Sequence, residues 1–280
     1  MAYKTILTFL PSVERTDRVL DVALPIAEAQ DAHLIGVHII PDVMTFYGMS
    51  ANQIPSDVIN QQQRSLKEEA DKVRVQFEKR ASSARARSEW RLAHDNQNDD
   101  IQKFINISMC ADLIVTDQNA FGSSRGTSDI AARMVLGTAR PVLVVPSAGN
   151  YVSVGKRPLI AWNGDKEAVR AAFDAVPLMA HAELVRILAI DPDTRGKNDM
   201  ISRGDELAVC LARHGLVTET TTSISAGIAV GDELLNRLSD FGSDLLVMGC
   251  YGHSRFREML FGGASRDVLE HMTVPVLMSH

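Results

Sequence analysis

The first half of the chain alternates short apolar runs with longer segments in which apolar residues recur at helical spacing. Short apolar or alternating runs predict strands, and they lie at 6–10, 33–40, 88–93, 112–116 and 141–145. Apolar residues at helical spacing predict the intervening helices, at about 19–27, 58–84, 101–107 and 128–136. Strand and helix therefore alternate through this half, which ends on a strand. Residues 41–57 are irregular and predict a long loop.

The second half repeats the same order of elements. Its predicted strands lie at 158–162, 184–190, 217–223, 244–248 and 275–279. Its predicted helices lie at about 169–176, 205–213, 230–241 and 266–271. Short sequences also recur at three matched places, such as Asp112-Leu-Ile-Val and Asp244-Leu-Leu-Val, which indicates an internal duplication. We therefore expect two domains, 1–147 and 156–280, with a polar linker between them.

Nearly continuous apolar strands that alternate with helices are typical of a parallel sheet with right-handed crossovers and helices on both faces. We therefore expect an α/β protein made of two doubly wound domains, each with a five-strand parallel sheet. The strands at 141–145 and 275–279 are expected at sheet edges, where unpaired backbone groups invite pairing.

The composition narrows the range of partners. A formal charge of -6 and an isoelectric point near 5.8 argue against nucleic acids and anionic membranes, which bind basic surfaces. No apolar run approaches the roughly 20 residues that span a bilayer, and the opening run is too short for a signal peptide. Three scattered cysteines, Cys110, Cys210 and Cys250, match no metal-ligand spacing. A reducing compartment, the cytoplasm, is therefore expected.

Glycines concentrate between the strand at 244–248 and the helix at 266–271. They stand at positions 249, 252, 262 and 263, where the chain must leave a strand, loop and enter a helix. Glycine suits such places because it takes positive φ or close backbone approach at little steric cost. The first amides of a helix lack intrahelical partners and lie at the positive end of its dipole. Gly262 to Ser265 are therefore predicted to form a phosphate cradle.

The spacing Gly249, two residues, Gly252, nine residues, Gly262 resembles the motif of the universal stress protein family. It lies between the fourth strand and the fourth helix of a five-strand unit, and the whole chain resembles a tandem of two such domains. The resemblance implies flavodoxin-like, adenine-nucleotide α-hydrolase-like domains packed as a pseudo-dimer, and a role in the stress response. It also implies that the edge strands at 141–145 and 275–279 meet each other, either within the chain or across a homodimer. In ATP-binding members it implies a loop that wraps ribose and phosphates, while the ends of the first two strands meet the base.

The second half carries most residues that this resemblance assigns to a site for ATP or another adenine nucleotide, alone or with Mg²⁺. At the end of its first strand these are Trp162, Asn163 and Gly164. In and after the glycine loop they are Met248, Gly249, Gly252, His253, Arg255, Gly262, Gly263, Ala264 and Ser265. Asn163 stands where ATP-binding members have Asp, which removes a charge but keeps an acceptor. Gly263 replaces a Ser or Thr hydroxyl and leaves the backbone amides.

The first half departs further from the motif. Its matching loop, 117–127, is shorter and lacks the glycine spacing. Counting back from the shared Pro-Val sequence places Asp129 where the second half has Gly263. A carboxylate there would cap its own helix and repel phosphate. Leu10-Pro-Ser at the end of the first strand offers neither Asp nor Asn. We therefore expect one nucleotide site, in the second half, and a first half that serves packing.

Polar side chains around the glycine loop leave two interpretations open, contact with phosphate or a solvated loop. They are Tyr251, His253, Ser254, Arg255 and Arg257. Cys250 has no group in sight that would orient His253 as its base, so a buried thiol is favoured over a nucleophile. The sequence shows no acid, base or nucleophile constellation and no metal motif, so at most slow hydrolysis of a bound triphosphate is expected. The alternative function is an interaction module of the same fold that binds no nucleotide.

Overall fold

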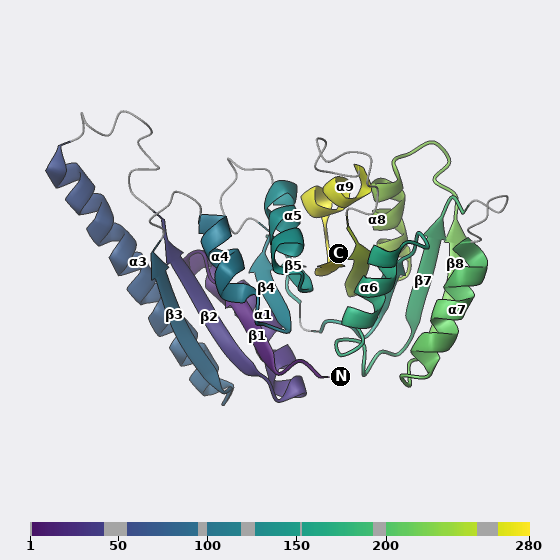
Figure 1. Ribbon diagram of the computed structural model, residues 1–280, viewed down its shortest axis with the longest axis horizontal. Helices are drawn as coiled ribbons and strands as arrows, with labels where there is room; N and C mark the ends of the chain where they lie inside the picture. Colours follow the sequence, from purple (N-terminus) through teal and green to yellow (C-terminus); the bar gives the residue numbers. More distant parts are fainter. Residues whose placement is uncertain are drawn as a thin grey trace.

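The computed structural model describes residues 2–41, 55–94, 100–118, 127–151, 153–192, 200–250 and 263–280. The strands of the first half are β1 (Thr5–Phe9), β2 (His33–Ile40), β3 (Ser88–His94), β4 (Leu113–Asp117) and β5 (Val142–Val145). Those of the second half are β6 (Pro158–Ala161), β7 (Val185–Ile190), β8 (Thr218–Ser223), β9 (Leu245–Gly249) and β10 (Val276–Ser279). Within these described ranges they form one ten-stranded sheet, in the order β3-β2-β1-β4-β5-β10-β9-β6-β7-β8 (Figure 1). Every strand expected from the sequence is confirmed.

Helices cover both faces of this sheet. Those of the first half are α1 (Val13–Gln30), α3 (Ser56–Ser83), α4 (Asp100–Ser108) and α5 (Thr127–Thr138). Those of the second half are α6 (Lys166–Asp174), α7 (Met200–Ala212), α8 (Val230–Asp240) and α9 (Gly263–His271). Two apolar cores run through both halves, one under α1, α3, α6 and α7 and the other under α4, α5, α8 and α9. Each half is therefore a doubly wound α/β unit, as predicted.

The two halves meet through their last strands. β5 and β10 pair antiparallel, with Val144 opposite Val276, whereas every other pairing between the described strands is parallel. The side-chain amide of Gln118 reinforces the junction, because its Nε2 atom donates to the backbone carbonyl of Leu269 over 2.7 Å. The expected meeting of the two Pro-Val strands is thus confirmed, and it occurs within the chain. A homodimer through edge strands would have to use β3 or β8, the outermost strands of the described sheet.

Strand register shows that the two halves correspond position by position. Thr8 of β1 pairs with Val115 of β4, and Ile160 of β6 pairs in the same way with Val247 of β9. Each position of a strand in one half therefore has a defined counterpart in the other. The expected domain limits at 147 and 156 fall in the connection between β5 and β6.

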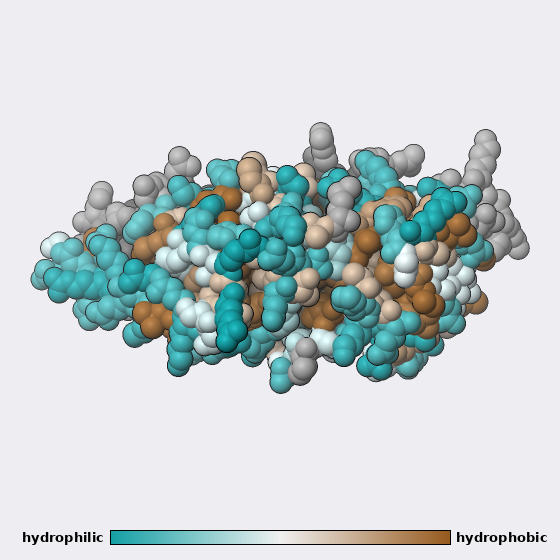
Figure 2. Space-filling view, turned by 90° about the horizontal axis from the view of Figure 1, so that it is seen from below, coloured by the Kyte–Doolittle hydropathy of each residue, from teal (hydrophilic) through white to brown (hydrophobic). Residues whose placement is uncertain are grey.

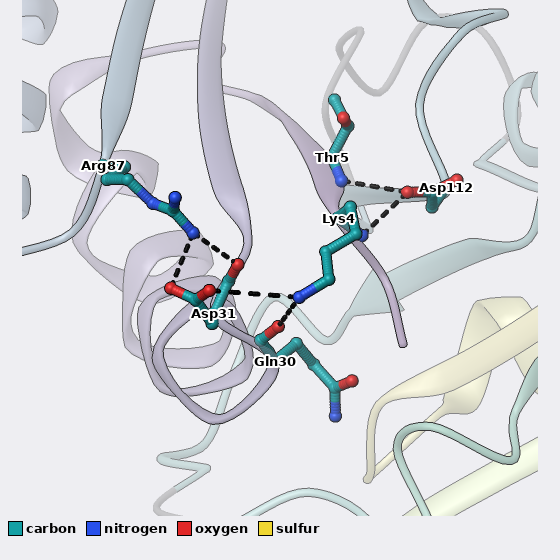
Figure 3. A network of polar contacts seen from close by, with 6 residues as sticks. All are labelled: Lys4, Thr5, Gln30, Asp31, Arg87 and Asp112. Atoms are coloured by element: carbon teal, nitrogen blue, oxygen red, sulfur yellow. Dashed lines mark hydrogen bonds and ion pairs between the residues drawn. The ribbon is translucent and has the colours of Figure 1, made fainter. Parts of the chain in front are cut away.

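An aspartate just before the fourth strand of each half ties down the segment that enters the first strand. The Oδ2 atom of Asp112 accepts hydrogen bonds from the backbone amides of Lys4 and Thr5, at 2.8 and 2.9 Å (Figure 3). The carboxylate of Asp244 likewise accepts from the amides of Gly155, Lys156 and Arg157, at 2.9 to 3.2 Å. The repeated Asp-Leu sequence is therefore a repeated backbone clamp.

The surface differs between the two ends of the molecule. Seen from below, hydrophilic side chains cover the end that carries α3, while apolar surface gathers near α7 and β8 (Figure 2). Val209 and Val217 are among the exposed apolar residues there. Among the described residues, no helix combines the length and apolar character needed to cross a membrane. Most of the loop expected at 41–57 lies outside the described residues.

Candidate functional site

The carboxyl ends of β6 and β9 form the point at which a ligand crevice is expected in the second half. The two strands are parallel neighbours, and Ala161 lies opposite Met248. The chain passes from β6 into α6 on one face of the sheet, and from β9 towards α9 on the other face. Open α/β sheets bind ligands outside the strand ends at such a topological switch point. The structure thus brings Trp162 beside Gly249, two residues assigned to one site by the resemblance.

The segment after β6 is a tight turn into α6. Trp162 is buried, and its amide donates to the carbonyl of Leu188 over 2.8 Å. Gly164 has a φ of +77°, a conformation that favours glycine. Asn163 is exposed, and its side chain hydrogen-bonds Asp165 twice, from Nδ2 to Oδ2 at 2.9 Å and from the Asp165 amide to Oδ1 at 3.1 Å. Asn163 therefore shapes the turn, and a ligand would compete with Asp165 for its amide.

A pocket of about 340 Å³ opens next to this turn. Its lining combines an indole, two apolar strand residues, small helix residues and threonine hydroxyls: Trp162, Ile187, Ala189, Ile201, Gly204, Asp205, Thr220, Thr221 and Thr222. α7 packs against the indole at Gly204, where a Cβ would lie 3.4 Å from two ring atoms, at ordinary contact distance. An aromatic wall, an apolar floor and a few polar groups are what a planar heterocyclic ligand needs. The sequence marked Trp162 but gave no sign of the pocket.

The corresponding space in the first half is filled. By strand register, Ala189 and Thr220 of the pocket correspond to His38 and Trp90. These two rings stack with centroids 6.4 Å apart. His38 is buried, its Nδ1 donates to the carbonyl of Leu10 over 2.7 Å, and burial lowers its pKa. Phe77 from α3 adds a third ring, 5.7 Å from Trp90. Aromatic side chains thus fill, in the first half, the space that forms an open pocket in the second half.

Gly249 ends β9 and permits α6 to lie directly against the strand. A Cβ at Gly249 would lie 2.4 Å from the backbone carbon of Glu167 and from the amide nitrogen of Ala168. Backbone atoms cannot move aside as a side chain can, so only glycine fits here. The first glycine of the motif therefore has a packing role of its own. The side chain of Met248 is buried in the core, so only its backbone is placed to meet a ligand at the end of β9.

Glu167 is a buried acid that sequence reasoning missed. Only 4% of the residue is exposed, and its Oε2 atom has no hydrogen-bond partner among the described residues. The Nζ atom of Lys166 lies 3.5 Å from Oε1, but that side chain is 86% exposed and well solvated. The pKa of the Cys250 thiol is raised, first by burial and then by the negative charge of Glu167. Burial and the raised pKa both favour a protonated thiol at Cys250, the interpretation that the sequence favoured over a nucleophile.

The other end of the predicted cradle is the beginning of α9. The helix begins at Gly263, which is exposed, and Ser265 is buried in the first turn. The first backbone amides of this helix have no partner within the helix, and they lie at the positive end of its dipole. Four of the predicted site residues, Gly252, His253, Arg255 and Gly262, lie outside the described residues. Within the described ranges, no group of three or more His, Cys, Asp or Glu side chains could hold a metal ion.

The first half places a buried ion pair where the second has Gly249 and Glu167. Asp117 corresponds to Gly249, and its side chain is fully buried at the end of β4. Arg15 of α1, the counterpart of Glu167, lies 3.5 Å from its Oδ1, and Arg18 lies 4.0 Å from its Oδ2. Counting Asp117 as the start of the loop was therefore wrong, because it is the last residue of a buried strand. Asp129 falls in the first turn of α5, as counted.

Comparison with known proteins identifies the domain that carries this site. Residues 159–280 match the model of the universal stress protein family. The second half of the chain belongs to this family. Over the full length, the fold is similar to that of a universal stress protein from Archaeoglobus fulgidus DSM 4304. The two share 17% identity at a TM-score of 0.74, covering 98% of this chain and 95% of that one.

A functionally unknown protein from Pseudomonas aeruginosa PAO1 also has this fold across the whole chain. It is 14% identical, with a TM-score of 0.58, and the match covers 99% of this chain and 92% of the other. A universal stress protein in complex with cAMP matches 46% of this chain and 98% of its own, at 20% identity and a TM-score of 0.37. A search of curated protein sequences finds no match. The tandem arrangement of universal stress protein folds is thus shared with other solved proteins.

Proposed function

We propose that the protein is a stress-response protein whose second half binds ATP or a related adenine nucleotide. The observation that carries the proposal is the contrast between matched places in the two halves. In the second half, a pocket walled by Trp162 adjoins the switch point at which the glycine motif begins. In the first half, His38 and Trp90 fill the pocket, and Asp117 occupies the strand end. A duplicated fold that is open in one copy and closed in the other indicates a ligand site in the open copy.

The proposed roles follow the chemistry of each place. The base lies in the pocket against Trp162, where Asp205 and threonine hydroxyls offer polar contacts. The turn at Asn163 and Gly164 and the end of β9 at Met248 and Gly249 border the sugar. Phosphates meet the backbone amides at the start of α9, with the remaining motif residues around them. These are Gly252, His253, Arg255, Gly262, Gly263, Ala264 and Ser265.

The wider setting is proposed on the same basis. Three free cysteines support a reducing compartment, the cytoplasm, and the net charge of -6 disfavours nucleic acid as a partner. Mg²⁺ would enter only together with the phosphates, since the described residues hold no cluster of metal ligands. Hydrolysis, if any occurs, is expected to be slow. A homodimer would form through β3 or β8, the outer strands of the described sheet.

A second candidate is an interaction module of this fold that binds no nucleotide. The observation that favours it is the engagement of the Asn163 side chain by Asp165, which leaves less of its amide for a ligand. The two candidates differ in whether the protein carries a nucleotide at all.

Nucleotide released from freshly purified, heat-denatured protein tests the first function directly, and calorimetry with ATP, ADP and AMP measures the affinity. We expect Gly262→Val to abolish binding, because a branched side chain would obstruct the loop as it enters α9. Asp129→Gly changes the corresponding helix start of the first half and serves as the matched control, with unchanged affinity. Absence of bound nucleotide together with no heat on titration would favour the interaction module. Equal affinity in Gly262→Val and the wild type would remove the site from this loop.

A further inference from the structure

Glu167 is a buried carboxylate whose hydrogen-bonding capacity is not satisfied by the described residues. A carboxylate has room for about four donors, and Oε2 of Glu167 has none within the described ranges. Leaving such a group buried and unpaired is costly, so native proteins rarely keep one without a reason. The hydroxyl of Ser279 is likewise buried without a described partner, and Ser279 lies opposite Gly249 on the neighbouring strand.

The position of Glu167 indicates which part of a ligand would reach it. Its backbone contacts Gly249, and the strand register places Gly249 beside Trp162, which lines the pocket. α9, whose amides suit phosphate, lies on the opposite face of the sheet. Glu167 therefore borders the strand end between the place for the base and the place for the phosphates. In a nucleotide, the sugar lies between these two parts.

Charge favours a neutral donor over a cation as the partner of Glu167. The residue stands in the first turn of α6, where the positive end of the helix dipole already stabilises a negative charge. A divalent ion would need several further oxygen ligands, and the described residues show no such cluster. A phosphate would be repelled. Two adjacent hydroxyl groups, in contrast, can both donate to one carboxylate without adding charge.

We propose that Glu167 accepts hydrogen bonds from the ribose hydroxyls of the bound nucleotide and so selects ribonucleotides over deoxyribonucleotides. This inference rests on the proposed function, since it concerns the same site. Glu167 would then supply the carboxylate that is missing at Asn163, from the first turn of the following helix. In the first half the same position is Arg15, which contacts Asp117 and leaves no acceptor for a sugar.

Calorimetric titration with ATP and with 2′-deoxy-ATP tests the inference on the wild type, Glu167→Gln and Glu167→Ala. We expect the wild type to prefer ATP by roughly tenfold or more, as for a hydrogen bond to a charged group. In Glu167→Ala the preference should disappear, so that this variant binds ATP and 2′-deoxy-ATP with equal affinity. The preference of Glu167→Gln should lie between those of the wild type and Glu167→Ala. Glu183→Gln, at an exposed site before β7, is the matched control and should keep the wild-type preference.

Thermal unfolding without ligand separates a binding role from a structural one. Because the ion-pair partner of Glu167 is the 86% exposed Lys166 and its Oε2 atom has no described hydrogen-bond partner, Glu167→Gln should unfold at the wild-type temperature or higher. A lowered unfolding temperature with an unchanged ATP preference would overturn the inference and leave the proposed function standing. Loss of the Glu167 effect when Mg²⁺ is chelated would also overturn it, in favour of a bound cation. If the wild type binds no adenine nucleotide, the proposed function and this inference both fall.

Discussion

The two halves of the chain share one fold and differ at two matched places. At the strand ends, the first half has a fully buried Asp117 facing Arg15, whereas the second has Gly249 and a buried Glu167 whose ion-pair partner is the exposed Lys166. Beside the second and third strands, the first half has stacked rings, and the second has a pocket of about 340 Å³. The buried acid thus faces two arginines of α1 in the first half, but an exposed lysine in the second.

This difference teaches that stability and ligand binding have been separated within a duplicated fold. A filled pocket and a paired ion stabilise the first half without any ligand. An open pocket and a buried carboxylate oxygen without a described hydrogen-bond partner lower the stability of the second half until something else supplies the contacts. A ligand that fits would therefore stabilise the second half more than the first, and local protection from amide exchange would report where it binds.

The sharpest way to break the comparison is to place a side chain at Gly249, where the first half carries one. Gly249→Ala should lower the free energy of unfolding by about 3 kcal/mol, because its Cβ meets backbone atoms of α6 that cannot rotate away. The control is Gly36→Ala in the first half, whose Cβ meets only the ring of Phe77 at 2.8 Å. Denaturant unfolding measures both, and an equal loss in the two variants would contradict the prediction.

Trp90 and Thr220 occupy corresponding positions of the two halves, so exchanging them tests the difference between a filled and an open pocket in each half. Trp90→Thr should destabilise the protein by about 2 kcal/mol, since it leaves a cavity beside His38 and Phe77. The reciprocal change, Thr220→Trp, enters the pocket and should weaken nucleotide binding by more than about tenfold at little cost in stability. Unfolding and calorimetry measure the two effects. Nucleotide binding that survives Thr220→Trp would place the base outside this pocket.

The free energy of unfolding should depend on the charge of the buried acid in the first half, Asp117, but not on that of Glu167 in the second. Asp117→Asn keeps the shape but weakens the contact with Arg15 and Arg18, and should lower the free energy of unfolding by about 1–2 kcal/mol. Glu167→Gln should have no such effect, because no described cation is buried against it. Urea unfolding at low and moderate salt compares them. A similar loss for both would mean that Glu167 has a structural partner.

The smallest expected effect is a pH dependence that comes from the first half alone. Burial lowers the pKa of His38, so the folded state resists protonation while the unfolded chain accepts a proton near the ordinary value of 6.5. Stability should therefore fall as the pH drops below about 6.5. His38→Gln should flatten that part of the profile. An unchanged slope in this variant would show that other groups cause the loss.

Most of the fold could be read from the sequence because buried parallel strands are short apolar runs that need no tertiary information. The runs at 33–40 and 112–116 were located to within a residue or so. The sequence predicted that β5 and β10 are edge strands of their units, and the family resemblance predicted that they meet each other. What the sequence left open was whether that pairing lies within one chain.

The site was only partly predictable because burial of a charged residue depends on distant backbone. Glu167 resembles any acid in the first turn of a helix, and only the close approach of α6 to Gly249 buries it. Asp129 was chosen by counting from the Pro-Val sequence, yet the buried acid at the strand end is Asp117. Extending the alignment of Asp112-Leu-Ile-Val with Asp244-Leu-Leu-Val by two residues would have set Asp117 against Gly249.

The antiparallel join of β5 and β10 has a thermodynamic consequence. Two separate single-domain chains that met in this way would come apart on dilution, and each would keep an identical cavity. Here a peptide tether holds the partners at a fixed effective concentration, so the join cannot be diluted away. The cavity of the first half could then be filled by aromatic side chains, which makes that half more rigid. The stoichiometry should accordingly be one ligand per chain, with a simple hyperbolic saturation curve at every protein concentration.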